Sequence, residues 1–125
     1  MRILFLAAAD SIHSYRWIKF FADRGHEVYW ISLTPLTVGS PLEKVQFYSI
    51  QKSTSKYIKM VHAVILARKL IHKIPFDVVH SHYAGIYGFI GALSKSHPFF
   101  LTAWGSDVLY AGKSLLKKPF IKYVL

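Results

Sequence analysis

Short apolar runs alternate along the chain with longer segments in which apolar residues recur at helical spacing. Alternation of this kind is typical of a parallel sheet wound with crossover helices. The pattern predicts an α/β fold, a Rossmann-like open parallel sheet of about five strands with helices on both faces. The predicted strands are residues 3–7, 27–32, 45–50, 78–80 and 99–103.

Helical periodicity and capping residues predict the helices between these strands. The first runs from a capping turn at 10–14 to about residue 24, and its bulky stripe of Trp17, Phe20 and Phe21 is interpreted as core. A long helix is predicted over 56–74, with lysines on its outer face. A third, over about 85–94, contains glycines that allow it to pack close to the sheet. Further helical segments follow residue 105 and residue 113.

A length of 125 residues, 53% of them hydrophobic, suits one domain with a real core. Arg2 and the apolar run after it imitate a signal peptide, but the run is short and a polar turn with an amphipathic helix follows, so a buried strand is expected. The segment 113–125 ends without a helix stop signal. We therefore expect a single domain over 1–125, truncated at its C-terminal end.

The formal net charge is +10, and the chain contains no cysteine. The lack of cysteine excludes disulfides, thiolate nucleophiles and zinc–cysteine sites, and it favours a cytoplasmic location. The charge suggests a polyanionic partner, but no specific nucleic-acid motif is present. Basic residues of the 56–74 helix form either an ordinary solvated face or a peripheral contact with the anionic inner face of a membrane. Those proposed for membrane contact are Lys56, Lys59, Lys69 and Lys73.

Ligands of open α/β sheets bind beyond the carboxyl ends of the strands, which directs attention to residues 8–14, 81–85 and 104–107. A dinucleotide fold is disfavoured because the first turn is not glycine-rich and no acid ends the second strand. No phosphate-binding Gly-Lys-Ser/Thr sequence follows any strand. A phosphoacceptor receiver is excluded because Asp10 stands alone instead of in a carboxylate cluster.

Two histidines, His80 and His82, lie on one side of a strand end. They could in principle chelate a metal, but no cysteine or acid cluster supplies further ligands, so no metal site is expected. We expect His80 to be a hydrogen-bonded core residue and His82 to face the cleft.

Other strand-end residues each have a structural and a functional interpretation. Asp107 and Ser106 either contact substrate or cap the following helix. Asp10 and His13 either meet a sugar or phosphate or serve as a cap and a surface residue. Trp104 either offers a stacking face to a sugar ring or lipid, or belongs to the core.

Five motifs occur in the order in which glycosyltransferase family 4 carries them, and together they span nearly the whole chain. They are MRILFL at 1–6, Trp17, RGHEV at 24–28, DVVHSH at 77–82 and LTAWGSD at 101–107. The chain thus resembles the N-terminal, acceptor-side domain of a two-domain (GT-B) glycosyltransferase. The chain departs from the pattern of this family in two places. Alanines replace glycines after the first strand, and Trp104 stands where many relatives carry histidine.

The resemblance implies a retaining, generally metal-independent transfer of a hexose-like unit from a UDP- or GDP-sugar to a glycan or lipid-linked acceptor, as in polysaccharide biosynthesis. The donor would be held by a C-terminal domain missing from these residues, so the fragment alone is expected to be inactive and to hold no cofactor. The alternative is a non-catalytic acceptor- or membrane-binding half that partners a separate donor-binding chain. The expected catalytic residues are Asp107 and His82, and the expected substrate-binding residues are Asp10, Ser11, His13, Tyr83, Trp104, Gly105 and Ser106.

Overall fold

The computed structural model describes residues 1–50, 56–109 and 118–125, without the side chains of 56–60, 118, 120 and 121. The strands are β1 (Arg2–Leu6), β2 (Glu27–Ser32), β3 (Val45–Ser49), β4 (Val78–His82) and β5 (Phe99–Thr102). The helices are α1 (Ile12–Asp23), α2 (Lys56–Ile71), α3 (Ile86–Ser94), α4 (Ser106–Leu109) and α5 (Lys118–Val124).

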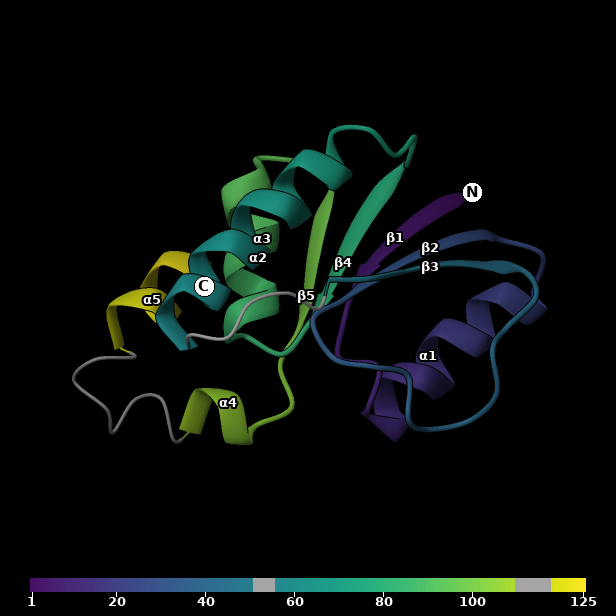
Figure 1. The fold of residues 1–125 in the computed structure, drawn as a ribbon, viewed down its shortest axis with the longest axis horizontal. Coiled ribbons are helices and arrows are strands. Elements are labelled where there is room, and N and C mark those ends of the chain that lie inside the picture. The colour runs from purple at the N-terminus through teal and green to yellow at the C-terminus, as the bar shows by residue number, and fades with distance from the viewer. Residues whose placement is uncertain (51–55, 110–117) are drawn as a thin grey trace.

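The five strands form one sheet in the order β3-β2-β1-β4-β5, and every neighbouring pair is parallel. Helix α1 lies on one side of this sheet, and α2, α3 and α5 lie on the other (Figure 1). The predicted α/β class, with a Rossmann-like parallel sheet, is therefore confirmed. Because all strands run the same way, their carboxyl ends meet at one edge.

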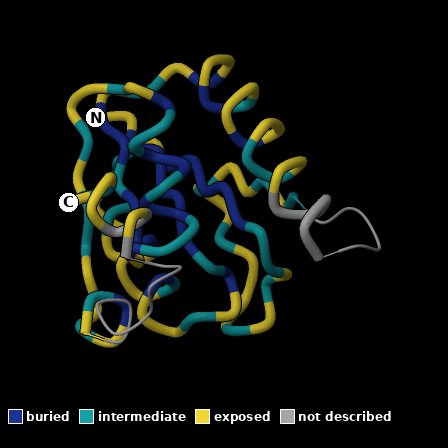
Figure 2. Tube along the Cα trace, turned by 90° about the vertical axis from the view of Figure 1, so that its left-hand side faces the viewer, coloured by how far each residue is buried: buried dark blue, intermediate teal, exposed yellow. Residues whose placement is uncertain are grey.

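The central strand β1 contributes to a hydrophobic core on each face of the sheet. Its Ile3 and Phe5 pack in the cluster that includes Ile18 of α1, whereas Leu4 and Leu6 pack in the cluster formed with α2 and α3. A strand buried on both faces reads as a continuous apolar run, which is why β1 imitates a signal peptide. Figure 2 shows the buried positions concentrated along the central strands.

Helix α1 packs on the sheet through one row of buried side chains, Ser14, Ile18 and Ala22. The expectation that the aromatic stripe is core is wrong for two of its members, since Trp17 is 38% exposed and Phe20 is 47% exposed. Trp17 and Phe21 come one position before Ile18 and Ala22, and successive helical residues are about 100° apart. The aromatic stripe therefore lies on the flank of the helix. Because this buried row packs against the sheet, the aromatic side chains of α1 lie at the side of the helix.

Helix α3 sits very close to the sheet, as its glycines predict. A Cβ atom added at Gly91 would lie 2.5 Å from Ser81 Oγ and would also overlap the ring of Phe99. No side chain fits at that separation, so glycine at this position sets the distance between α3 and β4.

Strand β4 extends to His82, two residues beyond the predicted end, because its polar residues pair with β5 in register from Val79 with Phe99 to His82 with Thr102. Helix α2 ends at Ile71, earlier than the predicted residue 74. Within the described residues, none of the helices is long and apolar enough to cross a membrane.

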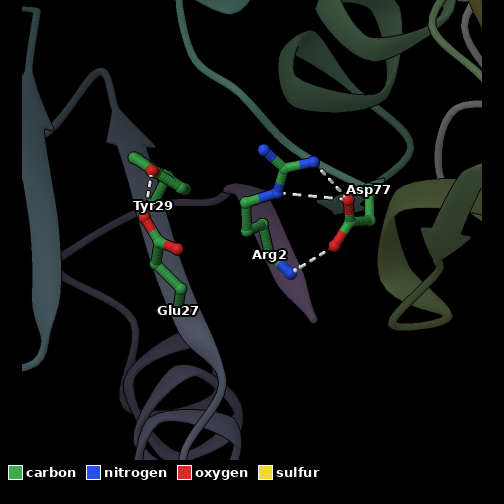
Figure 3. A network of polar contacts seen from close by, with 4 residues as sticks. All are labelled: Arg2, Glu27, Tyr29 and Asp77. Atoms are coloured by element: carbon green, nitrogen blue, oxygen red, sulfur yellow. Dashed lines mark hydrogen bonds and ion pairs between the residues drawn. The ribbon is translucent and has the colours of Figure 1, made fainter.

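A network of polar contacts lies at the amino-terminal edge of the sheet, opposite the carboxyl ends of the strands (Figure 3). The backbone N–H of Arg2 donates to Asp77 Oδ2 at 2.7 Å, and its guanidinium Nη2 donates to Oδ1 at 2.7 Å. These bonds from Arg2 lower the pKa of the Asp77 carboxyl. Nearby, the Tyr29 hydroxyl donates to the Glu27 carboxylate. The network joins β1 to the segment entering β4 and lies away from the strand-end segments.

Candidate functional site

Three segments that follow β1, β4 and β5 meet at the carboxyl edge of the sheet. His82 Nδ1 lies 3.4 Å from Ser14 Oγ in the first turn of α1. The ring centroids of His13 and Trp104 are 5.1 Å apart, and those of His82 and Trp104 are 5.7 Å apart. The prediction that these stretches share one edge is confirmed, and we call the group His13, Ser14, His82 and Trp104 the strand-end rim.

Trp104 occupies the middle of the strand-end rim and is partly open to solvent. Its ring is tilted by 32° from that of His13 and meets His82 edge-on at 82°. Trp104 is 36% exposed, so it is neither a core aromatic nor a free surface residue. An aromatic ring held in this way at the end of a strand can present a flat apolar surface to a ligand.

His82 is buried, with 1% of its surface exposed, so the expectation that it faces an open cleft is wrong. Trp17 from α1 and Trp104 from the β5–α4 segment cover it, with ring centroids 5.5 Å and 5.7 Å away. Burial, with a smaller effect of the neighbouring His80, lowers the pKa of His82 to about 3. The imidazole is therefore neutral near pH 7, and its Nε2 atom has no hydrogen-bond partner among the described residues.

His80 is hydrogen-bonded, as expected, but it is half-buried and does not belong to either core cluster. Its Nε2 atom lies 2.7 Å from Thr102 Oγ1, which joins β4 to β5 through side chains. Burial lowers the pKa of His80 as well. Within residues 1–50, 56–109 and 118–125, no cluster of three or more histidines and carboxylates is placed to hold a metal.

Asp107 is buried and accepts hydrogen bonds from three backbone amides. The N–H of Ala84 donates to Oδ2 at 2.6 Å, and those of Trp104 and Val108 donate to Oδ1 at 3.0 Å and 3.1 Å. The carboxylate thereby fixes the turn after β4 to the turn after β5. Of the two interpretations of Asp107, this geometry supports the structural one, since the side chain is only 5% exposed.

The turn after β1 is held by side chains from the end of β2. Ala9 N–H donates to Ser32 Oγ at 3.0 Å and to Thr34 Oγ1 at 2.9 Å, and Thr34 Oγ1 donates to Asp10 Oδ1 at 3.0 Å. Ser11 is the N-cap of α1 and accepts from the Ser14 amide at 3.5 Å. Ser11 therefore caps α1, and the alternative expectation that Asp10 is the cap is wrong. Asp10 lies in the turn before the helix and remains exposed at the edge.

Known proteins resemble this chain in sequence. The sequence profile of the family described as glycosyl transferase 4-like matches residues 2–125. The chain belongs to this family. Over 67 residues it is 37% identical to the uncharacterized glycosyltransferase MJ1178 of Methanocaldococcus jannaschii, a match that covers 51% of this chain. The same match covers 19% of that relative, so the domain corresponds to a small part of its length.

Three remaining candidates of this glycosyltransferase 4-like domain lie in the turns beside the strand-end rim. Tyr83 is 44% exposed and has a φ of 79°, and its N–H donates to Thr102 O at 2.9 Å. Gly105 has a φ of 84°, a conformation that favours glycine, and Ser106 begins α4. All three are therefore close to the strand ends.

Sequence reasoning missed polar residues that organise the site from neighbouring elements. Ser14 contacts His82, Thr102 contacts His80, and Ser32 with Thr34 holds the turn after β1. The available signal was position, because Ser32 ends one predicted strand and Thr102 is the next-to-last residue of another. Ser14 gave no such signal, since its role depends on burial against β4.

Of the lysines proposed for membrane contact, Lys56, Lys59 and Lys69 lie on α2, and Lys73 lies in the turn that follows this helix. Lys69 and Lys73 are exposed, whereas the side chains of Lys56 and Lys59 lie outside the described residues. The same helix exposes three aliphatic side chains, Val61 at 58%, Ile65 at 45% and Leu66 at 37%. The outer side of α2 is therefore both apolar and basic.

Proposed function

We propose that the strand-end rim forms the acceptor side of a cleft in which a hexose unit passes from a nucleotide-sugar to a glycan or lipid-linked acceptor, with retention of configuration. The observation that carries the proposal is the meeting of His13, His82 and Trp104 from three separate elements, in a chain of the glycosyl transferase 4-like family. The strand ends of an open parallel sheet are where such folds bind ligands.

In this proposal Trp104 supplies a stacking surface for the apolar face of an acceptor sugar. The exposed polar residues His13, Tyr83 and Ser106 would hydrogen-bond the hydroxyls of that sugar. Asp107 acts as a positioning residue, because it holds the Trp104 backbone N–H at 3.0 Å and ties it to the turn after β4. Neutral His82 supports the underside of Trp104.

The donor in this proposal is a UDP- or GDP-sugar bound mainly by a second domain. Transfer requires preorganised groups aimed at the departing diphosphate, and these stabilise the transition state more than any other contribution. The first turn after β1 offers little of this chemistry, because the Ala9 amide is already bonded to Ser32 and Thr34. We therefore expect residues 1–125 alone to transfer no sugar.

The test is a kinetic assay of a polypeptide that includes the proposed second domain. It is assayed with panels of UDP- and GDP-sugars and with panels of glycan and lipid-linked acceptors. Loss of a stacking contact worth about 1.4 kcal/mol corresponds to a tenfold effect. We expect Trp104→Ala to raise the KM for the acceptor about tenfold while the KM for the donor stays unchanged. Tyr123→Ala, an exposed aromatic change on α5, is the matched control. A rise confined to the donor KM would refute the assignment.

A second proposal concerns the outer side of α2. We propose that Val61, Ile65 and Leu66 enter the interface of an anionic membrane while Lys69 and Lys73 meet its headgroups. Exposed aliphatic and basic side chains on one helix are typical of interfacial helices. Each basic residue near such a surface contributes about 1 kcal/mol. Contact of this kind would bring a lipid-linked acceptor to the domain.

A further inference from the structure

Asp10 differs from the other aspartates because no cation and no backbone amide in the described part of the chain holds its carboxylate. Asp23 and Asp77 form ion pairs, and Asp107 accepts from three backbone amides. Asp10 is exposed, and the hydroxyl of Thr34 donates to its Oδ1 atom at 3.0 Å. Among the residues that the structure describes, nothing donates to its Oδ2 atom. That oxygen is therefore available to a ligand.

Asp10 lies at the place in the sheet where an open α/β fold binds its ligands. The chain leaves β1 through α1 toward β2, and it leaves β4 through α3 toward β5, in the opposite direction along the sheet. The two connecting helices lie on opposite faces (Figure 1). Ligands of such folds bind at this switch point, between the carboxyl ends of the two strands. Asp10 follows β1, and His13, three positions later, contacts Trp104.

The hydroxyl of Thr34 is held in place without help from Asp10. The Thr34 N–H donates to Ser32 Oγ at 3.0 Å, and Ser32 Oγ donates to the Thr34 carbonyl at 2.9 Å. From α3, the Tyr87 hydroxyl accepts from the Leu33 N–H at 3.1 Å. Ser32 and Tyr87 are both buried, so they fix this segment firmly. Thr34 therefore orients the carboxylate of Asp10, and the reverse does not hold.

The charge of Asp10 limits the kind of group that it can bind. The amino terminus of α1 would by itself attract an anion. Asp10 stands directly before Ser11, the N-cap, and its negative charge repels phosphates and carboxylates from this position. A sugar hydroxyl is neutral and donates a hydrogen bond. Such a bond to a carboxylate is about twice as strong as one between neutral groups. The group that suits Asp10 is therefore a hydroxyl of a neutral sugar.

From these observations we propose that Asp10 is an acceptor-binding residue, whose Oδ2 atom accepts a hydrogen bond from a hydroxyl of a neutral acceptor sugar. Thr34 is the positioning residue that aims this carboxylate. The proposal rests on the acceptor site proposed for the strand-end rim, to which it adds a polar contact beside the stacking surface of Trp104. Thr34 touches no substrate and acts through Asp10 alone.

The test is a double-mutant cycle in the kinetic assay of the polypeptide that includes the proposed second domain. The probes are neutral glycans of glucose, galactose, mannose and N-acetylglucosamine, free and lipid-linked. Asp10→Asn should raise the acceptor KM about tenfold and leave kcat and the donor KM unchanged, because a neutral amide replaces the carboxylate. Thr34→Val removes the orienting hydroxyl and should raise the same KM about threefold, whereas Thr34→Ser keeps the hydroxyl and should retain the parent value.

The double variant separates positioning from a merely structural role. Because Thr34 acts through Asp10, the acceptor KM of Asp10→Asn combined with Thr34→Val should equal that of Asp10→Asn alone. Additive effects of the two changes would overturn the positioning role. The control is Asp23→Asn, an exposed change at the other end of α1, which should leave the acceptor KM unchanged. Urea denaturation checks that each variant is folded.

Trp104→Ala distinguishes failure of this proposal from failure of the acceptor site on which it rests. An acceptor KM that rises in Trp104→Ala but not in Asp10→Asn would refute the role of Asp10 and leave the rim site intact. A rise confined to the donor KM in Asp10→Asn would assign this carboxylate to the donor. No transfer to any probe, or transfer insensitive to both changes, would refute the acceptor site and this proposal with it.

Discussion

Acidification to pH 5 should destabilise the fold through His82, well above the pH at which the buried imidazole itself is protonated. The pKa of His82 is lowered from its ordinary value of 6.5 to about 3 in the folded chain. Between these two values the unfolded chain binds a proton that the folded chain does not, so the free energy of unfolding falls as the pH falls. The contribution is fully present above pH 6.5 and is lost as the pH drops toward 3.

The size of the effect follows from the width of that window. Each pH unit within it changes the free energy of unfolding by about 1.36 kcal/mol, so a fall from pH 6.5 to pH 5 removes about 2 kcal/mol. This is a large part of the roughly 5–15 kcal/mol that stabilises a typical domain. His80 acts in the same direction, because burial lowers its pKa as well.

Urea denaturation at pH 7.5 and pH 5 measures the effect, with His82→Asn as the test and His72→Asn, an exposed change in the turn after α2, as the control. The wild type and the control should each lose about 2 kcal/mol more than His82→Asn between the two pH values. Equal losses in all three proteins, or an NMR titration of His82 with a midpoint near 6.5, would refute the reasoning.

Three further predictions concern other parts of the fold. Asp107→Asn should lower the free energy of unfolding by about 1–3 kcal/mol in urea titrations, because an amide nitrogen cannot accept a hydrogen bond from a backbone N–H. The exposed change Asp10→Asn is the control. Equal stability of the two variants would contradict the anchoring role of Asp107. Gly91→Ala should cost about 1–3 kcal/mol by the same measurement, since its methyl group overlaps Ser81 and Phe99, and an unchanged stability would show that α3 can shift. Changing Lys56, Lys59, Lys69 and Lys73 to glutamine should abolish pelleting of the protein with phosphatidylglycerol vesicles. Neutral phosphatidylcholine vesicles are the comparison. Unchanged pelleting of the variant, or a parent protein that does not pellet, would count against the membrane contact at α2.

The sheet and the shared edge of its strand ends could be predicted because they depend on local signals. Apolar runs of strand length and capped amphipathic segments indicate a parallel sheet, and parallel strands necessarily bring their carboxyl ends together. The meeting of His13, His82 and Trp104 follows from that rule. The predicted end of β4 at residue 80 was too early because Ser81 and His82 are polar, yet pairing with β5 keeps both in the sheet.

Burial at the site could not be predicted, because it is decided by residues distant in sequence. His82 is enclosed by Trp17 and Trp104, which come from two other elements. Asp107 meets Ala84, which lies 23 residues earlier in the chain. In α1, two adjacent stripes are apolar enough to face the sheet, and only the fit of small Ser14 and Ala22 against the strands determines which one does.

The three tryptophans of the chain provide the most direct test of the proposed acceptor site. In a ¹H–¹⁵N NMR titration with acceptor glycans, the indole N–H signal of Trp104 should shift progressively, because the sugar stacks on that ring. The signal of Trp30, which is buried and bonded to Ala7 O at 2.9 Å, should remain unchanged. Saturable binding that leaves the Trp104 signal in place would contradict the claim that the strand-end rim holds the acceptor.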